Sequence, residues 1–160
     1  DINCNSISPQ LVELIVEDSS GNSSTCTATV TVEDNIAPII TCSADFTVNT
    51  DAGSCGAVIF GGDPTISDNC AEEVTITLVS GLAIGSTFPV GTTTNTYTAT
   101  DGSGNSATCS FNVTVTDDEA PVVNCSDITV ELDASGNASI TAGDIDNGSN
   151  DACGLSLIHI

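Results

Sequence analysis

The 160-residue chain contains no lysine and no arginine, so nothing offsets its 22 acidic residues and its net charge is −22. Nucleic acids and anionic membrane surfaces are bound through clustered cations, so the composition excludes both as partners by charge. Without lysine the chain also cannot form lysine–asparagine isopeptide crosslinks. Two interpretations of the acidity remain open. The surface is either soluble and self-repelling, or divalent cations supply the missing positive charge.

Aromatic residues are scarce, with one tyrosine, four phenylalanines and no tryptophan. High net charge with few aromatics can signal disorder. However, the chain is 39% hydrophobic, carries eight cysteines and shows clean period-two patterning. These features predict folded β structure, and the few aromatics offer little for stacking against glycans.

Sequence signatures of catalysis are missing too, including HExxH, a glycine-rich phosphate loop and a plausible Ser/His/Asp set. The only histidine, His159, lies in an apolar tail and is expected to be a packed or interface residue. The sequence therefore predicts a protein that is not an enzyme. It shows no signal peptide, transmembrane run or lipidation motif, and no membrane insertion is expected.

The eight cysteines include no CxxC pair, which argues against zinc ligation and against a redox-active pair. An even number of cysteines in a chain rich in Thr, Ser, Gly and Asp instead predicts disulfides. Disulfides in turn predict an oxidising, extracellular or cell-surface setting.

The most informative positive feature is an internal repeat. Residues 18–42 read DSSGNSSTCTATVTVEDNIAPIITC, and residues 101–125 read DGSGNSATCSFNVTVTDDEAPVVNC. The copies lie 83 positions apart and share 14 of 25 residues without a gap. A self-match at a fixed period predicts a modular array, and therefore a scaffold rather than a single asymmetric active site.

Alternating apolar and polar residues between turn signals predict an all-β, antiparallel β-sandwich fold. No segment has a convincing helical period. The expected strands are residues 11–17, 26–32, 45–49, 56–60, 74–78, 96–100 and 109–115.

Two proline-containing linkers, around Pro38 and Pro121, divide the chain. Residues 37–118 form one complete module, residues 1–36 resemble the back half of another, and residues 119–160 resemble a front half. A half-module cannot bury its sheet face alone. Two completions remain open: adjoining repeats of the same polypeptide, or head-to-tail self-association of subunits into a filament.

The ordered motifs APIITCSADFTV, CGAVIF, SDNC, FPVGTTT and YTATDGSGNSATCSFNVTVTDDEAP resemble the hyalin repeat (HYR) family. This resemblance covers residues 37–121 and implies tandem immunoglobulin-like β-sandwich modules, one complete and one split. The split module looks like a variant found in large bacterial surface proteins. The resemblance implies an adhesion or matrix role at a cell surface, of bacterial type, without catalysis.

The four cysteines of each module allow three connectivities. If the two modules share one disulfide and a relocated cysteine keeps its partner, the simplest scheme keeps each bond of the split module within one half-module. That scheme is Cys42–Cys70, Cys55–Cys109, Cys125–Cys153 and Cys4–Cys26.

In an immunoglobulin-like sandwich, the chain enters at the end that carries two of the connecting loops, so acidic residues should gather at each junction. Calcium takes six to eight oxygen ligands in irregular geometry, and interdomain calcium that rigidifies the junctions is the expected cofactor. The alternative is ordinary turn formation by Asp and Asn. The first junction should gather Asp34, Asn35, Asp68, Asn69, Asp101 and Asn105. The second should gather Asp117, Asp118, Glu119, Asn150 and Asp151, with Asp18 and Asn22 from the adjoining half-module.

Five N-x-S/T sequons are candidates for glycosylation, although such sequons also arise by chance in this composition. They lie at Asn22, Asn112, Asn124, Asn137 and Asn147, and Asn112 is expected to be the most accessible.

Taken together, these features predict a structural extracellular protein, a β-sandwich repeat unit of a filament or surface fibre held by disulfides and calcium. The alternative is an adhesin repeat that binds glycans or cell-surface partners. A fibre protein assembles in isolation, whereas an adhesin repeat stays monomeric until it meets its ligand.

Overall fold

The computed structural model describes residue 4, residues 8–70 and residues 74–157, so the expectation for His159 lies outside the described residues. The elements are β1 (Gln10–Glu17), β2 (Ser23–Val30), β3 (Ile39–Thr41), β4 (Phe46–Asn49), β5 (Gly56–Val58), β6 (Thr65–Ser67), β7 (Thr75–Ser80), β8 (Thr87–Pro89), β9 (Gly91–Thr100), β10 (Ser106–Thr116) and α1 (Ala142–Ile145). The predicted all-β fold is confirmed. No helix in this part of the chain is long and apolar enough to cross a membrane.

Each predicted strand overlaps an observed one, with shifted ends. The largest shift is at β9, which begins at Gly91, whereas the prediction began at residue 96. The strands β3, β6 and β8 were missed, because three residues are too few to display an alternating pattern. The single turn α1 was missed for the same reason, and it begins where Thr141 N donates to Asp144 Oδ2 at 2.6 Å.

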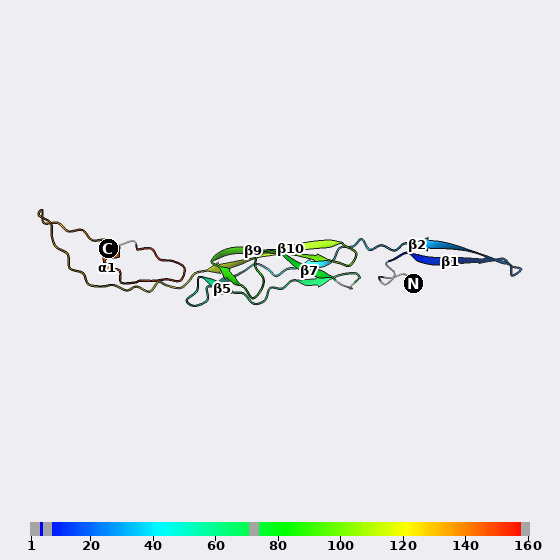
Figure 1. Ribbon diagram of the computed structural model, residues 1–160. Coiled ribbons are helices and arrows are strands. Elements are labelled where there is room, and N and C mark those ends of the chain that lie inside the picture. Colours follow the sequence, from blue (N-terminus) through cyan, green and yellow to red (C-terminus); the bar gives the residue numbers. More distant parts are fainter. Residues whose placement is uncertain (1–3, 5–7, 71–73, 158–160) are drawn as a thin grey trace. The chain divides into compact units, whose positions relative to one another are not determined.

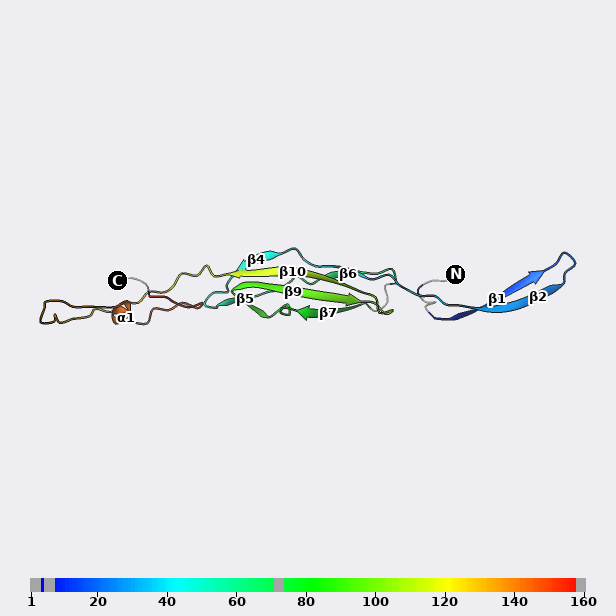
Figure 2. The same ribbon diagram turned by 90° about the horizontal axis from the view of Figure 1, so that it is seen from above.

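The strands form a four-stranded sheet in the order β4-β10-β9-β7 and three two-stranded sheets, β1-β2, β3-β6 and β5-β8 (Figures 1 and 2). In the four-stranded sheet, β4 runs parallel to β10, with Phe46 opposite Val113 and Val48 opposite Val115. A parallel pair cannot be joined by a tight turn, so residues 50–105 separate these two strands along the chain.

The chain divides into two compact units. The first unit comprises Asp1–Cys42, Pro64–Val79 and Thr96–Cys109, and the second comprises Ser43–Asp63, Ser80–Asn95 and Ser110–Ile160. In the second unit, β10 buries Phe111, Val113 and Val115, while Asn112 and Thr114 between them are half-buried. This strand therefore follows the period-two pattern of its sequence.

The other buried apolar side chains of the second unit come from β5, β8 and the residues beside them: Ala57, Ile59 and Phe88. In the first unit, β9 buries Tyr97 and Ala99, and Pro38 is buried as well. Each unit therefore has its own core positions.

The β1-β2 hairpin has the same local structure as its repeat in β9 and β10. The first residue of β2, Ser23, lies 83 positions before the first residue of β10. In the turns, Asp18 Oδ1 accepts hydrogen bonds from Ser20 N and Asn22 N, at 2.8 and 2.9 Å. The carboxylate of Asp101 accepts the equivalent pair of hydrogen bonds. The DxSGN sequence therefore encodes the turn itself.

The disulfides correct the predicted scheme. The structure joins Cys4 to Cys70, Cys42 to Cys109 and Cys55 to Cys153. The predicted pairs Cys42–Cys70, Cys55–Cys109, Cys125–Cys153 and Cys4–Cys26 are therefore wrong. Cys26 and Cys125 are free, exposed thiols.

The physical reason is that a disulfide needs Cα atoms within about 4.4–6.8 Å, whatever the sequence spacing. Cys42 follows β3 and Cys109 lies in β10, and their Cα atoms are 5.7 Å apart. The bond thus joins the residue after β3 to β10, and these two strands belong to different sheets. The prediction assumed that cysteines pair within their own half-module. The packing of the strands instead brings together cysteines that are distant in the sequence.

Candidate metal centre

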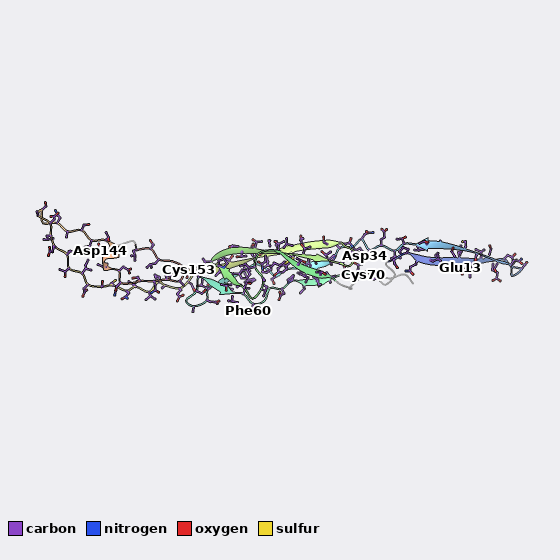
Figure 3. The ribbon with its side chains drawn as sticks, in the orientation of Figure 1. Glu13, Asp34, Phe60, Cys70, Asp144 and Cys153 are labelled. Atoms are coloured by element: carbon purple, nitrogen blue, oxygen red, sulfur yellow. A yellow bond between two sulfur atoms is a disulfide. The ribbon has the colours of Figure 1, made fainter. Side chains whose placement is uncertain are left out.

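Three carboxylates converge in the first unit, those of Asp34, Asp68 and Asp101. Asp34 follows β2, Asp68 follows β6 directly, and Asp101 follows β9 directly. One carboxylate oxygen from each residue lies within 4.8 Å of the other two. Figure 3 labels Asp34 beside Cys70, which comes from the same loop as Asp68. The structure therefore brings together the three acidic residues that were assigned to the first junction.

Asp101 is buried and strongly hydrogen-bonded. The side-chain amide of Asn105 donates to Asp101 Oδ2 at 2.8 Å, and the backbone N–H groups of Ser103 and Asn105 donate to Oδ1. The amide of Asn105 is the main reason that the pKa of Asp101 lies below its ordinary value, and burial opposes this effect in part. Asp101 is therefore ionised at neutral pH.

Asp68 is the unusual member of the cluster. Its Oδ2 accepts a hydrogen bond from Cys70 N at 2.8 Å. Its Oδ1 is buried and has no hydrogen-bond partner among the described residues. A buried carboxylate oxygen without a partner is unfavourable, and no lysine or arginine exists in this chain to neutralise it. Calcium is a hard cation that prefers oxygen ligands. This cluster offers it three carboxylates, one of which has a buried oxygen without a hydrogen bond.

Two asparagines hold Asp34 in place. Asn69 Nδ2 donates to Asp34 Oδ1 at 3.2 Å, and Asn105 Nδ2 donates to the backbone carbonyl of Asp34 at 3.0 Å. Asn35 is exposed and lines a neighbouring hollow together with Cys4 and Cys70. The Cys4–Cys70 disulfide thus ties the loop that carries Asp68 to the segment before β1.

The second junction, in the second unit, is less complete. The structure brings together Asp117 and Asp151, with Cys153 beside them. However, Cys153 is in a disulfide with Cys55, so its sulfur is not available as a thiolate ligand. These two carboxylates alone make a weaker cation site than the three of the first unit.

The other residues expected at the second junction have different partners. Asp118 accepts a hydrogen bond from the amide of Asn49, and Glu119 Oε2 accepts one from Gly53 N at 2.9 Å. Both carboxylates thus accept hydrogen bonds from residues at or beyond the end of β4, although Glu119 also lines a hollow with Asn150 and Asp151. Asn150 pairs with Val122 through backbone hydrogen bonds of 2.8 and 2.9 Å. Asp18 and Asn22 belong to the first unit, where Asn22 Nδ2 donates to Asp18 Oδ2 at 2.8 Å.

The sequons differ in exposure, and one expectation is overturned. Asn22, Asn124, Asn137 and Asn147 are exposed, whereas Asn112 is half-buried. Asn112 Nδ2, the atom that would carry a glycan, donates to Asp45 Oδ2 at 2.9 Å, and its Oδ1 accepts from Thr94 at 2.7 Å. Asn112 points away from the core as predicted from the alternation, but residues from neighbouring strands cover it. It is therefore the least accessible of the five.

Sequence reasoning missed two structural polar residues. Asp45 accepts hydrogen bonds from the backbone N–H of Asn112 at 2.8 Å and from its side chain. Asn95 is fully buried, where its amide accepts from Leu82 N at 2.9 Å and donates to Leu82 O at 2.7 Å. The only local signal for Asn95 was a polar residue at an inward position of an alternating strand.

The comparison with protein families matches residues 33–115 to the HYR domain, which is more than half of the chain. The chain belongs to the HYR domain family. In this HYR chain, the matched region includes all of the strands from β3 to β9 and the three carboxylates of the first-unit cluster.

Relatives of this HYR chain extend the match beyond the domain. Hyalin from Strongylocentrotus purpuratus is 33% identical over 92% of the chain, and hyalin from Lytechinus variegatus is 36% identical over 75% of it. The sushi, von Willebrand factor type A, EGF and pentraxin domain-containing protein 1 of Rattus norvegicus is 36% identical over 66%. The chain spans only 13%, 23% and 3% of these three proteins, respectively.

Family membership and these relatives indicate an extracellular module of the adhesion type. The three relatives come from sea urchins and a rat, so they give no support to the expected bacterial origin.

Proposed function

We propose that this HYR chain is a non-enzymatic structural repeat unit that associates head-to-tail into an extracellular filament, with calcium bound at the junctions. Calcium bound by Asp34, Asp68 and Asp101 would rigidify the linker that follows β2. The disulfide Cys4–Cys70 would restrain the same place covalently.

The observation that carries this proposal is the buried Oδ1 of Asp68, which has no hydrogen-bond partner in the described part of the chain. It belongs to a cluster of three carboxylates in a chain with no cationic side chains except one histidine. Calcium would satisfy this oxygen and relieve the repulsion among the three side chains. Ordinary turn formation accounts for the hydrogen bonds of Asp101 but not for the orphaned oxygen of Asp68.

The test is negative-stain electron microscopy of the purified chain after removal of calcium with EGTA and again after calcium is returned. We expect ordered filaments with calcium, shortened or disordered filaments with EGTA, and recovery on calcium addition. Magnesium at the same concentration is the control, because its demand for octahedral geometry makes it a poor substitute.

Discrete particles that look the same with and without EGTA would contradict both the filament and its dependence on calcium. The chain would then be best described as an adhesin repeat that binds a glycan or a cell-surface partner. The exposed sequons at Asn22, Asn124, Asn137 and Asn147 are also open to glycan attachment in a host that modifies them.

A further inference from the structure

The two free cysteines occupy equivalent positions to a bonded pair elsewhere in the same chain. Cys26 lies 83 positions before Cys109, and Cys125 lies 83 positions after Cys42. Cys42 and Cys109 form a disulfide, whereas Cys26 and Cys125 are exposed thiols. Cys26 and Cys125 are therefore the two thiols from which a second disulfide equivalent to Cys42–Cys109 could form.

The hairpin that carries Cys26 lacks the cover that its repeat has. Among the described residues, β1 and β2 pair only with each other. Leu14 and Val16 of β1 are 60% and 59% exposed, whereas the equivalent Tyr97 and Ala99 of β9 are 7% and 0% exposed. An isolated two-stranded sheet with an apolar face is marginally stable in water. The inward face of this hairpin is therefore an interface that the described residues leave uncovered.

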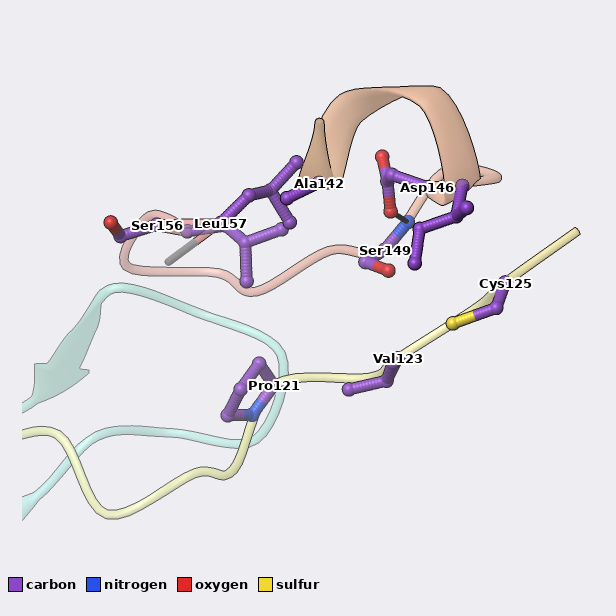
Figure 4. A pocket seen from close by; sticks show the side chains of 10 residues that line it. Pro121, Val123, Cys125, Ala142, Asp146, Ser149, Ser156 and Leu157 are labelled. Atoms are coloured by element: carbon purple, nitrogen blue, oxygen red, sulfur yellow. Dashed lines mark hydrogen bonds between the residues drawn. The ribbon is translucent and has the colours of Figure 1, made fainter. Parts of the chain in front are cut away.

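The segment that carries Cys125 also exposes apolar residues whose equivalents in the complete module are covered. Its bridge between Val122 and Asn150 is the repeat of the pairing of Ile39 with Ser67 in the β3-β6 sheet. Yet Pro121 and Val123 are exposed, Val123 by 71%, while the equivalent Pro38 is buried and Ile40 half-buried. Val123, Cys125 and Leu157 line a hollow of about 270 Å³ (Figure 4). Among the described residues, no strand of a second sheet covers this segment.

The complete module indicates how the two parts fit. In it, β4 follows Cys42 and pairs in parallel with β10, so that Phe46 lies opposite Val113. The sequence 127–130, DITV, repeats the DFTV of residues 45–48. By the same register, Ile128 would pair with Val30, and Val130 with Val32. Both Ile128 and Val130 are exposed in the structure, as expected for a strand without its partner.

We propose that residues 119–157 of one copy of this chain cover the β1-β2 hairpin of a second copy, and that a disulfide between Cys125 and Cys26 fixes this contact. The proposal rests on the head-to-tail association proposed above, but not on calcium. A second copy is the favoured occupant because this chain itself carries the segment equivalent to the one that covers β9 and β10 in the complete module.

The bond forms by thiol–disulfide exchange with an added disulfide such as oxidised glutathione. The two thiols lose two protons and two electrons, a sulfur–sulfur bond forms, and the oxidant is released as two glutathione thiols. No other reactant is needed.

The decisive experiment oxidises a 1:1 mixture of ¹⁴N- and ¹⁵N-labelled chains and digests it, unreduced, with a glutamyl endopeptidase. The chain has no trypsin sites, but cleavage after Glu17 and Glu33, and after Glu119 and Glu131, isolates Cys26 and Cys125 in separate peptides. Each of these two peptides contains a single cysteine. We expect peptides 18–33 and 120–131 to be linked, with about half of the pairs carrying one light and one heavy peptide, as random exchange between chains requires.

Two variants give an independent readout on non-reducing gels. Cys26→Ser alone and Cys125→Ser alone should form no covalent oligomer, whereas their mixture should give a covalent dimer and nothing longer. Wild-type protein should give a ladder. Linked pairs of a single isotope only, alkylation of both thiols after oxidation, or dimers from either variant alone would overturn the proposal.

The outcome also separates this inference from the proposed function. Filaments that persist while both thiols remain alkylatable would overturn the Cys26–Cys125 bond and leave head-to-tail assembly standing. Monomers by light scattering under oxidising conditions, with and without calcium, would overturn both.

Discussion

At the scale of single residues, Asp68 provides the most direct test of calcium binding. Replacing Asp68 by Asn removes one of three carboxylates and should weaken calcium affinity by about tenfold or more, because affinity follows the charge of the ligand set. The same variant should stabilise the calcium-free protein, since it reduces repulsion with Asp34 and Asp101. Isothermal titration calorimetry and thermal unfolding in EGTA measure the two effects.

The matched control is Asp63→Asn, which removes the same charge from an exposed residue outside the cluster. Equal losses of calcium affinity in both variants would mean that calcium responds only to net charge. The assignment to Asp34, Asp68 and Asp101 would then fail.

Asp45 makes stability depend on pH. The backbone N–H of Asn112, and then its side chain, hydrogen-bond to Asp45 and hold its pKa below the ordinary value of 3.8. A depressed folded-state pKa contributes stability above the unfolded-state value, and this contribution is lost as the pH falls through the folded-state value. Asp45→Asn should therefore lower the free energy of unfolding at pH 7. Below about pH 4, the difference in free energy of unfolding between the wild type and this variant should shrink.

Urea unfolding at pH 7, 5 and 3 measures this effect, with Asp63→Asn as the charge-matched reference. A gap between the wild type and Asp45→Asn that stays constant over this range would refute the role of the Asp45 hydrogen bonds.

At the scale of the elements, β8 shows how three residues can matter to a core. Phe88, in β8, is completely buried, whereas Phe60, just beyond β5, is 84% exposed. Phe88→Ala should destabilise the protein by about 3–5 kcal/mol through lost burial and a residual cavity. Phe60→Ala should change stability by less than about 0.5 kcal/mol. Chemical denaturation of both variants checks the contrast, which comparable losses would contradict.

The long alternating strands were predictable because their burial follows a period of two. Phe111, Val113 and Val115 alternate with polar residues in the sequence, and they are buried where the polar residues are not. The DxSGN sequences mark the turns of the two hairpins. Three-residue strands such as β8 carry no such period. Their existence depends on partners distant in sequence, as in the pairing of Ala57 with Phe88.

The candidate site divides in the same way. The structure brings Asp34, Asp68 and Asp101 together because each follows a strand, and in a sandwich the ends of strands share an edge. The cysteine pairs were wrong because sequence spacing does not encode which Cα atoms come within bonding distance. Cys4 pairs across 66 positions with Cys70, and nothing local to either residue indicates the other.

At the scale of the whole molecule, the net charge of −22 makes electrostatic self-repulsion the main long-range contribution to the free energy of folding. Raising the salt concentration from about 0.01 M to about 0.15 M shortens the Debye length from roughly 30 Å to roughly 8 Å. In EGTA, this change should raise the melting temperature by several degrees, because screening reduces self-repulsion.

Saturating calcium should diminish that salt effect, since bound cations already neutralise part of the charge. Differential scanning calorimetry at both salt concentrations, with and without calcium, measures it. A melting temperature indifferent to salt in EGTA would mean that repulsion is not a significant part of stability.

The Cys42–Cys109 disulfide has a mechanical consequence. A pulling force applied between handles attached at Ala37 and Asp118 passes through this bond, so the path that bears the force omits residues 43–108. At about 3.5 Å per residue, the fully extended path between the handles is roughly 56 Å long in the oxidised module and roughly 290 Å long in the reduced one. Single-molecule stretching with and without a reductant should resolve these two lengths. The complete module would thus be nearly inextensible between these two points when oxidised and compliant when reduced.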